Sequence, residues 1–280
     1  MRKFAEAYLR KFSALLFVAA CLFIQPAQIE GQSFDSFNTD DFTMLDTYYL
    51  GRAVAANILS VYRPYTASPE VTQYLNLICQ ALVINSNYPP TFNGYHVIIL
   101  DSDEFNAFAS PAGHIFITKR LIETVTSEDM LAAVIAHEIA HVTLRHSIAL
   151  IKDIRLVNEL SAIADWAAGT AARFSNTPGQ AGGFRSSVTR TVDALMRNGY
   201  SQTQEFEADA QAILLLSRAG YDPRALVELL RVLQRQGPQI TGLYLTHPSP
   251  ALRIANIQRF SYPGITTGEY RTARFRNLRW

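Results

Sequence analysis

Apolar residues recur along this chain mostly at the three-to-four-residue spacing of helices. Residues 42–62 and 69–84 each carry such a stripe, and a proline follows the first and opens the second. Two short β-rich runs, residues 95–100 and 115–118, flank a turn region and predict a small sheet. Further helical patterns cover residues 127–146, 156–172, 187–196, 202–219 and 222–236, and a final helix is expected from Ser249-Pro250. We therefore expect an α+β fold that is mainly α.

The N-terminal residues 1–28 have the pattern of an export signal peptide, with a basic start and an apolar core at residues 12–24. That core is shorter than the roughly 20 residues that a membrane-spanning helix needs. The run Val18-Ala19-Ala20-Cys21 resembles a lipoprotein processing box, which would lipidate Cys21 and attach the mature chain to a membrane. The apolar run continues past Cys21, however, which favours simple cleavage. Both routes predict a periplasmic protein, soluble or lipid-anchored.

Composition and charge exclude some classes of partner. The chain has 25 Lys and Arg against 24 Asp and Glu, for a net charge of +1, and no basic stripe. This balance argues against a nucleic-acid-binding protein. With Cys21 in the signal, Cys79 has no partner for an internal disulfide. We expect one domain over residues 40–262, followed by a tail at residues 263–280.

His137, Glu138 and His141 are the candidate chemistry of the predicted helix 127–146. Histidines four residues apart lie on one helix face and can share a metal ion, and the glutamate between them is placed to activate a bound water. A catalytic zinc needs a third protein ligand. One peptidase class uses a histidine six residues after the second, with a glycine between, but Ser147 and Leu144 occupy those positions. That class is excluded.

The other class takes a glutamate from a later helix, and two glutamates are candidates. Glu205 has Asp209 one helical turn later, whereas Glu159 has no carboxylate there. A zinc-bound imidazole normally donates its second N–H to an acceptor such as a carboxylate. We therefore expect Glu205 as the ligand and Asp209 as its support, and we interpret Glu207 as a solvated residue.

With these residues in place, the sequence resembles the M48 family of zinc metallopeptidases, in particular its BepA/Oma1-like periplasmic branch. The resemblance covers residues 106–259 and rests on the following motifs in order: Asn106-Ala107-Phe108-Ala109 with Gly113, His137 to His141 with Arg145-His146, Tyr200-Ser201 with Glu205 to Asp209, Gly220-Tyr221-Asp222-Pro223, and Thr246-His247-Pro248-Ser249 with Arg253-Ile254. It implies a gluzincin-type fold with a small sheet beside the active-site helix. It also implies one Zn²⁺ per chain, held by His137, His141 and Glu205, with Glu138 activating water.

The resemblance also implies roles outside the metal ligands. His247 and Arg253 match positions near the catalytic cleft, and in this branch the histidine can approach the zinc and hold a resting state. Residues 108–117 match an edge strand that holds an extended peptide substrate. By this resemblance, four residues are expected to contact the substrate: Asn106, Ala107, Phe108 and Gly113. The residues after Arg253 are too few for the helical-repeat domain of BepA-type proteins, so we expect this chain to lack it.

These features predict a zinc metalloendopeptidase of the bacterial envelope that cleaves unfolded or misassembled proteins in quality control. One alternative is a chaperone-like assembly factor whose protease site is seldom used and is gated by His247 and a loop with Gly182-Gly183. Another is a peripheral membrane protease. It would use the charge-poor helix 156–172, although burial of that helix is the preferred interpretation.

Overall fold

The computed structural model describes residues 44–86, 91, 93–153, 192, 199–237, 246–260, 262–265 and 268–278. These residues belong to one compact unit that spans Phe37–Trp280. Several predicted features lie outside the described residues: the signal 1–28, the helix 156–172 with Glu159, and the loop with Gly182-Gly183. Of the predicted helix 187–196, only Val192 is described.

The strands of the described part form one three-stranded sheet in the order β1-β3-β2. β1 (His96–Leu100) runs parallel to β3 (His114–Thr118), and β2 (Ala107–Ala109) runs antiparallel to β3 at the edge. The expectation of a single edge strand over residues 108–117 is wrong. Gly113 has a φ of 87° in a turn that reverses the chain, so this stretch holds the edge strand β2 and the central strand β3.

Helices make up most of the described chain, as the apolar spacing predicts. Their bounds are α2 (Met44–Val61), α3 (Pro69–Ile84), α4 (Lys119–Thr124), α5 (Glu128–Thr143), α6 (His146–Asp153), α10 (Gln202–Arg218), α11 (Arg224–Arg235), α13 (Pro250–Ile257) and α14 (Glu269–Arg276). A mainly helical α+β fold with a small sheet beside α5 is therefore confirmed.

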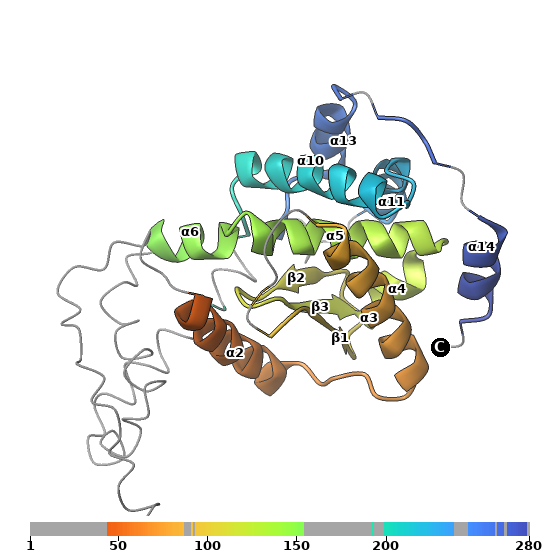
Figure 1. Cartoon of the computed structure of the whole chain (residues 1–280). Helices are drawn as coiled ribbons and strands as arrows, with labels where there is room; N and C mark the ends of the chain where they lie inside the picture. The colour runs from red at the N-terminus through yellow and green to blue at the C-terminus, as the bar shows by residue number, and fades with distance from the viewer. Residues whose placement is uncertain are drawn as a thin grey trace, which may run out of the picture. The chain divides into compact units, whose positions relative to one another are not determined.

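Helix α5 lies at the centre of this arrangement, between the sheet and the pair α10 and α11 (Figure 1). Every residue from Glu128 to Val142 is buried. Side chains alternate across the sheet, so Ala107 and Ala109 face the large core with α5, whereas Phe108 packs with Phe116 in a second core under α2. The helix with the candidate chemistry is thus surrounded by apolar side chains.

Two helix boundaries differ from the sequence-based expectation. The helix predicted over 127–146 ends at Thr143, because Arg145 adopts a φ of 57° and a new helix, α6, begins at His146. The expected tail at 263–280 contains α14, so the helix that starts after Ser249 is not the last one. α14 has no buried residue, and its polar sequence carries no apolar stripe that would predict it.

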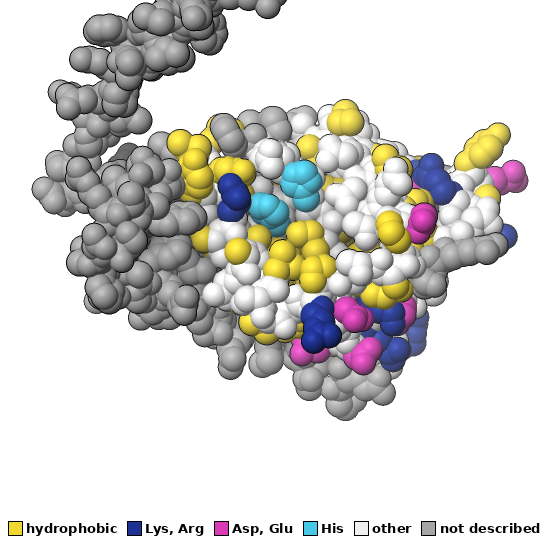
Figure 2. All heavy atoms as spheres, turned by 90° about the horizontal axis from the view of Figure 1, so that it is seen from below, with side chains coloured by type: hydrophobic (Ala, Val, Ile, Leu, Met, Phe, Trp, Pro, Cys, Tyr) yellow, Lys and Arg dark blue, Asp and Glu magenta, His cyan; other side chains and the backbone are white. Residues whose placement is uncertain are grey.

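The surface seen in Figure 2 mixes Lys and Arg with Asp and Glu and shows two histidine side chains beside apolar ones. Among the described histidines, His96 is exposed and His114 is half-buried, and the centres of their rings lie 6.1 Å apart at the start of β1 and β3. None of the described helices combines the length and the apolar character needed to cross a membrane.

Candidate metal centre

Helix α5 supplies the first two side chains of the site. The Ser127 hydroxyl accepts a hydrogen bond from the Met130 amide at 3.2 Å and caps the start of the helix. His137 and His141 follow one turn apart, and they are 4% and 1% exposed. Their Nε2 atoms lie 3.1 Å apart. The two imidazoles therefore converge on one point inside the protein.

Helix α10 brings one carboxylate to the same point and a second one to the far side of the His137 ring. A capping box between Ser201 and Gln204 fixes its first turn, and Glu205 and Asp209 follow on one face, both fully buried. One Glu205 oxygen lies 3.3 Å from Nε2 of His141, and the other lies 3.5 Å from Nε2 of His137. Two helices that are far apart in sequence thus place three metal-ligand side chains together.

His247 adds a fourth donor, from the short described segment before α13. Its Nδ1 lies 2.9 Å from both oxygens of Glu205. This segment can approach α10 closely because Gly199 lacks a side chain: a Cβ there would lie 2.0 Å from the carbonyl oxygen of Thr246. One donor atom from each of His137, His141, Glu205 and His247 lies within 4.8 Å of the others.

Arg253 and Asp209 form a buried ion pair behind the first histidine. Two guanidinium nitrogens of Arg253 donate to the Asp209 carboxylate at 2.6 and 3.0 Å. The same carboxylate lies 3.1 Å from Nδ1 of His137. Asp209 therefore fixes the His137 ring from the side opposite the cluster, as a supporting carboxylate does for a metal-bound imidazole.

The electrostatics of the cluster suit a cation. Burial alone would raise the pKa of Glu205, but the charge of His247 and hydrogen bonds from the surrounding histidines hold that pKa well below its usual range. Burial and Arg253 oppose protonation of His137, yet its hydrogen bonds to carboxylates raise its pKa to about 9. Burial lowers the pKa of His141 to about 3. An ionised carboxylate surrounded by imidazoles is a donor set that fits Zn²⁺, and a metal bound at Nε2 of His137 would take the place of the proton that the carboxylates favour there.

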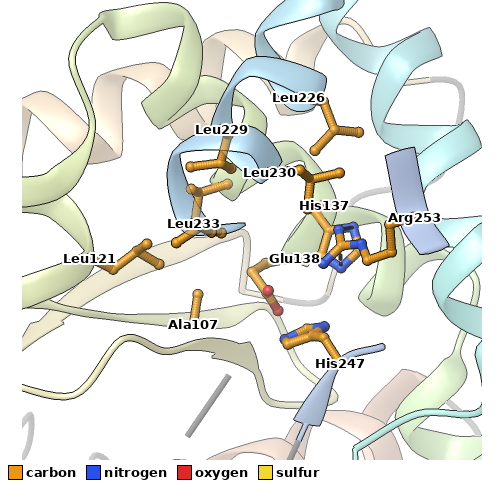
Figure 3. Close-up of a pocket in the computed structure, with 11 residues that line it drawn as sticks. Ala107, Leu121, His137, Glu138, Leu226, Leu229, Leu230, Leu233, His247 and Arg253 are labelled. Atoms are coloured by element: carbon orange, nitrogen blue, oxygen red, sulfur yellow. Dashed lines mark hydrogen bonds between the residues drawn. The ribbon is translucent and has the colours of Figure 1, made fainter. Parts of the chain in front are cut away.

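Glu138 lies next to this cluster with an unused oxygen. Its side chain is buried, and Oε2 has no hydrogen-bond partner among the described residues. Burial raises the pKa of this carboxyl group. In Figure 3 the carboxylate points toward the side of the cavity that His247 lines. A buried acceptor without a protein partner is suited to hold a water molecule or to take a proton.

A cavity that is open to solvent begins at Glu138, and the empty space there, with the solvent at its mouth included, is about 350 Å³. One side is polar, with His137, His247 and Arg253. The other side is apolar, and its residues are Ala107 of β2, Leu121 of α4, Val134 of α5, and Leu226, Leu229, Leu230 and Leu233 of α11 (Figure 3). The leucines of α11 recur at helical spacing and face one side, a sequence signal that could have placed this helix beside the site.

The residues predicted to contact substrate lie in different places. Ala107 lines the cavity. Asn106 is buried and accepts a hydrogen bond from the Thr246 hydroxyl at 3.4 Å, which ties β2 to the segment with His247. Phe108 stacks on Phe116 on the opposite face of the sheet, and Gly113 lies in the turn, so neither lines the cavity.

Two further side chains contact His141 and a third contacts one of these two, and no catalytic or metal-binding role was expected for any of them. The Tyr200 ring stacks on His141 with 4.0 Å between ring centres. Nδ1 of His146 lies 2.9 Å from Nδ1 of His141, and its Nε2 lies 3.2 Å from Glu207. Glu207 is exposed, as expected, but it is also bound to a buried histidine. The sequence signal was the motif Arg145-His146, whose geometry depends on the left-handed turn at Arg145.

Comparison with known proteins identifies the family. The sequence profile described as Peptidase family M48 matches residues 69–261. The chain belongs to this family. A glutamate-liganded, gluzincin-type metallopeptidase domain agrees with the cluster on α5 and α10.

The relatives of this chain include bacterial assembly-enhancing proteases and mitochondrial metalloendopeptidases. The chain is 34% identical over 201 residues to the Beta-barrel assembly-enhancing protease of Escherichia coli (strain K12), which covers 69% of this chain and 39% of the relative. It is 29% identical over 223 residues to the Yersinia pestis protein of the same name, with 77% and 45% covered. It is 32% identical over 158 residues to the Mitochondrial metalloendopeptidase OMA1 of Schizosaccharomyces pombe, with 55% and 43% covered. The chain thus spans less than half the length of these relatives.

Proposed function

We propose that this chain is a zinc-dependent endopeptidase that hydrolyses peptide bonds in unfolded or misassembled proteins of the bacterial envelope. The observation that carries this proposal is the cluster of three histidines and Glu205 with the unpartnered oxygen of Glu138 beside it. In the M48 fold such a cluster is most simply understood as a hydrolytic metal site.

His137, His141 and Glu205 would hold the metal, and bound zinc would supply Lewis acidity toward a water molecule and the scissile carbonyl. Glu138 takes the proton from the attacking water on its free oxygen and passes it to the leaving amine. Asp209 holds His137 in place and is itself fixed by Arg253. His247 faces the cavity and is the side chain best placed to donate to the developing oxyanion.

The class of substrate is inferred from the cavity and the sheet edge beside it. The leucines of α11 offer an apolar surface next to Glu138, which fits the apolar side chains that unfolded proteins expose. β2 stands at the edge of the described sheet and contributes Ala107 to the cavity, so an extended peptide could pair with its backbone. The names of the relatives, which include a barrel-assembly protease and a mitochondrial metalloendopeptidase, are in keeping with protein substrates.

A periplasmic location, soluble or lipid-anchored at Cys21, is part of the proposal and depends on the export pattern of residues 1–28. Cell fractionation of the full chain and of a Cys21→Ser variant measures it. Release of both into the soluble periplasmic fraction supports a cleaved signal, whereas membrane association of the parent alone supports lipidation.

The test of the enzyme is metal content together with cleavage of an unfolded protein. We expect one zinc per purified chain and cleavage of reduced, unfolded casein that stops with a chelator and returns with added zinc. Glu205→Gln should lose both zinc and cleavage, because it removes a ligand charge from the cluster. A chain that binds zinc but cleaves no unfolded protein under any condition would contradict the proposal.

The second candidate is a chaperone-like assembly factor, and the position of His247 favours keeping it. This histidine contacts both oxygens of Glu205, so it can compete for the position that a hydrolytic site keeps open. His247→Ala separates the two functions. A rise in cleavage indicates a protease that His247 gates, a fall indicates a protease in which His247 stabilises the oxyanion, and no cleavage in parent or variant indicates a binding role.

A further inference from the structure

His141 contacts a chain of two side chains that leads to the protein surface. Its Nδ1, on the opposite side of the ring from the cluster, lies 2.9 Å from Nδ1 of His146. The other ring nitrogen of His146, Nε2, lies 3.2 Å from a carboxylate oxygen of Glu207. His146 is buried, whereas the Glu207 side chain is 55% exposed.

We propose that His146 and Glu207 are positioning residues for the metal ligand His141, and that Glu207 lets a surface carboxylate tune the affinity of the site for zinc. The inference rests on the proposed zinc site. It adds a second support to that site, because Asp209 fixes His137 and a separate pair of residues fixes His141.

The tautomers of the two rings follow from the geometry. Nε2 of His141 faces Glu205 and Nε2 of His137, so it is the nitrogen whose lone pair would bind a metal. A neutral imidazole with a free Nε2 carries its proton on Nδ1, and that N–H must donate to Nδ1 of His146. His146 then carries its own proton on Nε2 and donates it to Glu207. Each ring nitrogen of His141 and His146 then has one role, as donor or as acceptor. The series of hydrogen bonds ends on the Glu207 carboxylate, which can only accept.

Backbone and packing hold this chain of hydrogen bonds in place. The left-handed turn at Arg145 ends α5 and brings His146 back toward His141, only five residues earlier in the sequence. Tyr200 stacks on His141 with an angle of 16° between the rings and also lies against His146, with 5.8 Å between ring centres. The rings therefore have little freedom to turn, so the carboxylate at the end of the chain can select one tautomer of His141.

Glu207 differs from Asp209 in a way that affects function. Asp209 is fully buried and paired with Arg253, so replacing it also changes a buried ion pair. Glu207 lies mostly in solvent and can be replaced with little effect on packing. An outer partner of a metal ligand typically contributes about 10- to 100-fold to metal affinity, and solvent screening places Glu207 at the low end of that range.

The experiment measures zinc affinity by competition with a chromogenic chelator, in parent, Glu207→Ala and Glu207→Gln, with Glu228→Ala as the matched control. Glu228 is an exposed carboxylate on the neighbouring helix α11. We expect about 10-fold weaker zinc binding in Glu207→Ala. Glu207→Gln should bind more tightly than Glu207→Ala, because its amide oxygen can still accept from His146. Glu228→Ala should match the parent.

Two further readouts separate positioning from a merely structural role. The melting temperature of the metal-free protein should be equal in Glu207→Ala and Glu228→Ala. Nitrogen-15 NMR of the zinc-loaded protein should show His141 protonated at Nδ1 and His146 at Nε2 in the parent, and a mixture of His146 tautomers in Glu207→Ala. His146→Ala should weaken zinc binding more than Glu207→Ala. If this variant of a buried residue does not fold, the variants of the exposed Glu207 still test the inference.

Equal zinc affinity in Glu207→Ala and Glu228→Ala would overturn the inference and leave the zinc site intact. The opposite tautomers in the parent would overturn it as well. A parent chain that binds no zinc would refute the proposed function and this inference with it, so the two failures are distinguishable.

Discussion

The two ends of α5 each bury a glutamate, and the two carboxylates are treated differently. At the N-terminal end, Glu128 accepts hydrogen bonds from Tyr74 at 2.5 Å and Tyr221 at 3.2 Å. Arg274 of α14 donates to both of its oxygens, at 2.9 and 2.5 Å. At the C-terminal end, Glu138 has an oxygen without any partner among the described residues.

The difference distinguishes a carboxylate that stabilises the fold, Glu128, from one that is available for catalysis, Glu138. A buried carboxylate whose acceptor sites are filled holds elements together and has no capacity left for a ligand. Here Glu128 joins α3, the loop before α11, and α14 to the start of α5, where a negative charge also suits the helix dipole. Glu138 has the opposite character, since its desolvated oxygen gains a partner only when water or substrate enters.

The largest expected effect, on the rate of cleavage, comes from changing Glu138, the carboxylate with an unpaired oxygen. Glu138→Gln should lower cleavage of unfolded casein by about 10²- to 10⁴-fold, because the general base is lost. Zinc content and the melting temperature of the metal-free protein should not fall, since no bond to Oε2 is broken. Cleavage within twofold of the parent would contradict the role of Glu138.

Asp209→Asn is expected to have the next largest effect. It removes the charge that fixes His137, so zinc affinity should fall by about 10- to 100-fold. Chelator competition measures this change. Glu128→Gln is the control, because it alters an equally buried carboxylate on the same compact unit. Equal zinc affinity in the two variants would show that a carboxylate beside His137 matters no more to zinc binding than one at the far end of α5.

Glu128→Gln should instead change stability. The amide cannot accept from both tyrosines and from Arg274, so the free energy of unfolding should fall by about 2 kcal/mol. Urea unfolding with excess chelator measures this without a contribution from metal binding. Cleavage by the folded variant should be unchanged at low temperature. An unchanged unfolding midpoint would mean that the N-terminal network does not stabilise the fold.

The features that sequence reasoning found are those set by local chemistry. The start of α3 at Pro69, the cap at Ser127 and the start of α13 after Ser249 follow from residue types that favour helix N-termini. The convergence of His137 and His141 follows from helical periodicity alone. Pairing them with Glu205 needed only the rule that a carboxylate one turn later supports a ligand.

The features it missed depend on contacts between distant segments or on unusual backbone. An arginine at position 145 does not predict a positive φ, yet the φ of 57° at Arg145 ends α5 and turns His146 back toward His141. The substrate role of Phe108 came from the resemblance to an edge strand and stays a prediction. What the sequence did not provide is that alternation along β2 places its ring on the other side of the sheet from the cavity. α14 lacks an apolar stripe, and its docking depends on contacts with distant segments, among them the ion pairs of its arginines with Glu128 and Asp129 and the packing of Phe275 against the core.

The docking of α14 leads to the smallest expected effect. Arg274 is 55% exposed, so its ion pair with Glu128 is screened by water, and Arg274→Ala should cost about 1 kcal/mol or less. The change should also be smaller when Glu128 is already Gln, because the two side chains share one interaction, and a double-mutant cycle by urea unfolding measures that coupling. Additive effects would mean that α14 docks through its other contacts, such as Arg271, which donates to the Gly220 carbonyl at 2.6 Å. Zinc affinity should not change in any of these variants, since the ion pairs of α14 with α5 are made to Glu128 and Asp129 at its N-terminal end and not to the histidines of the cluster.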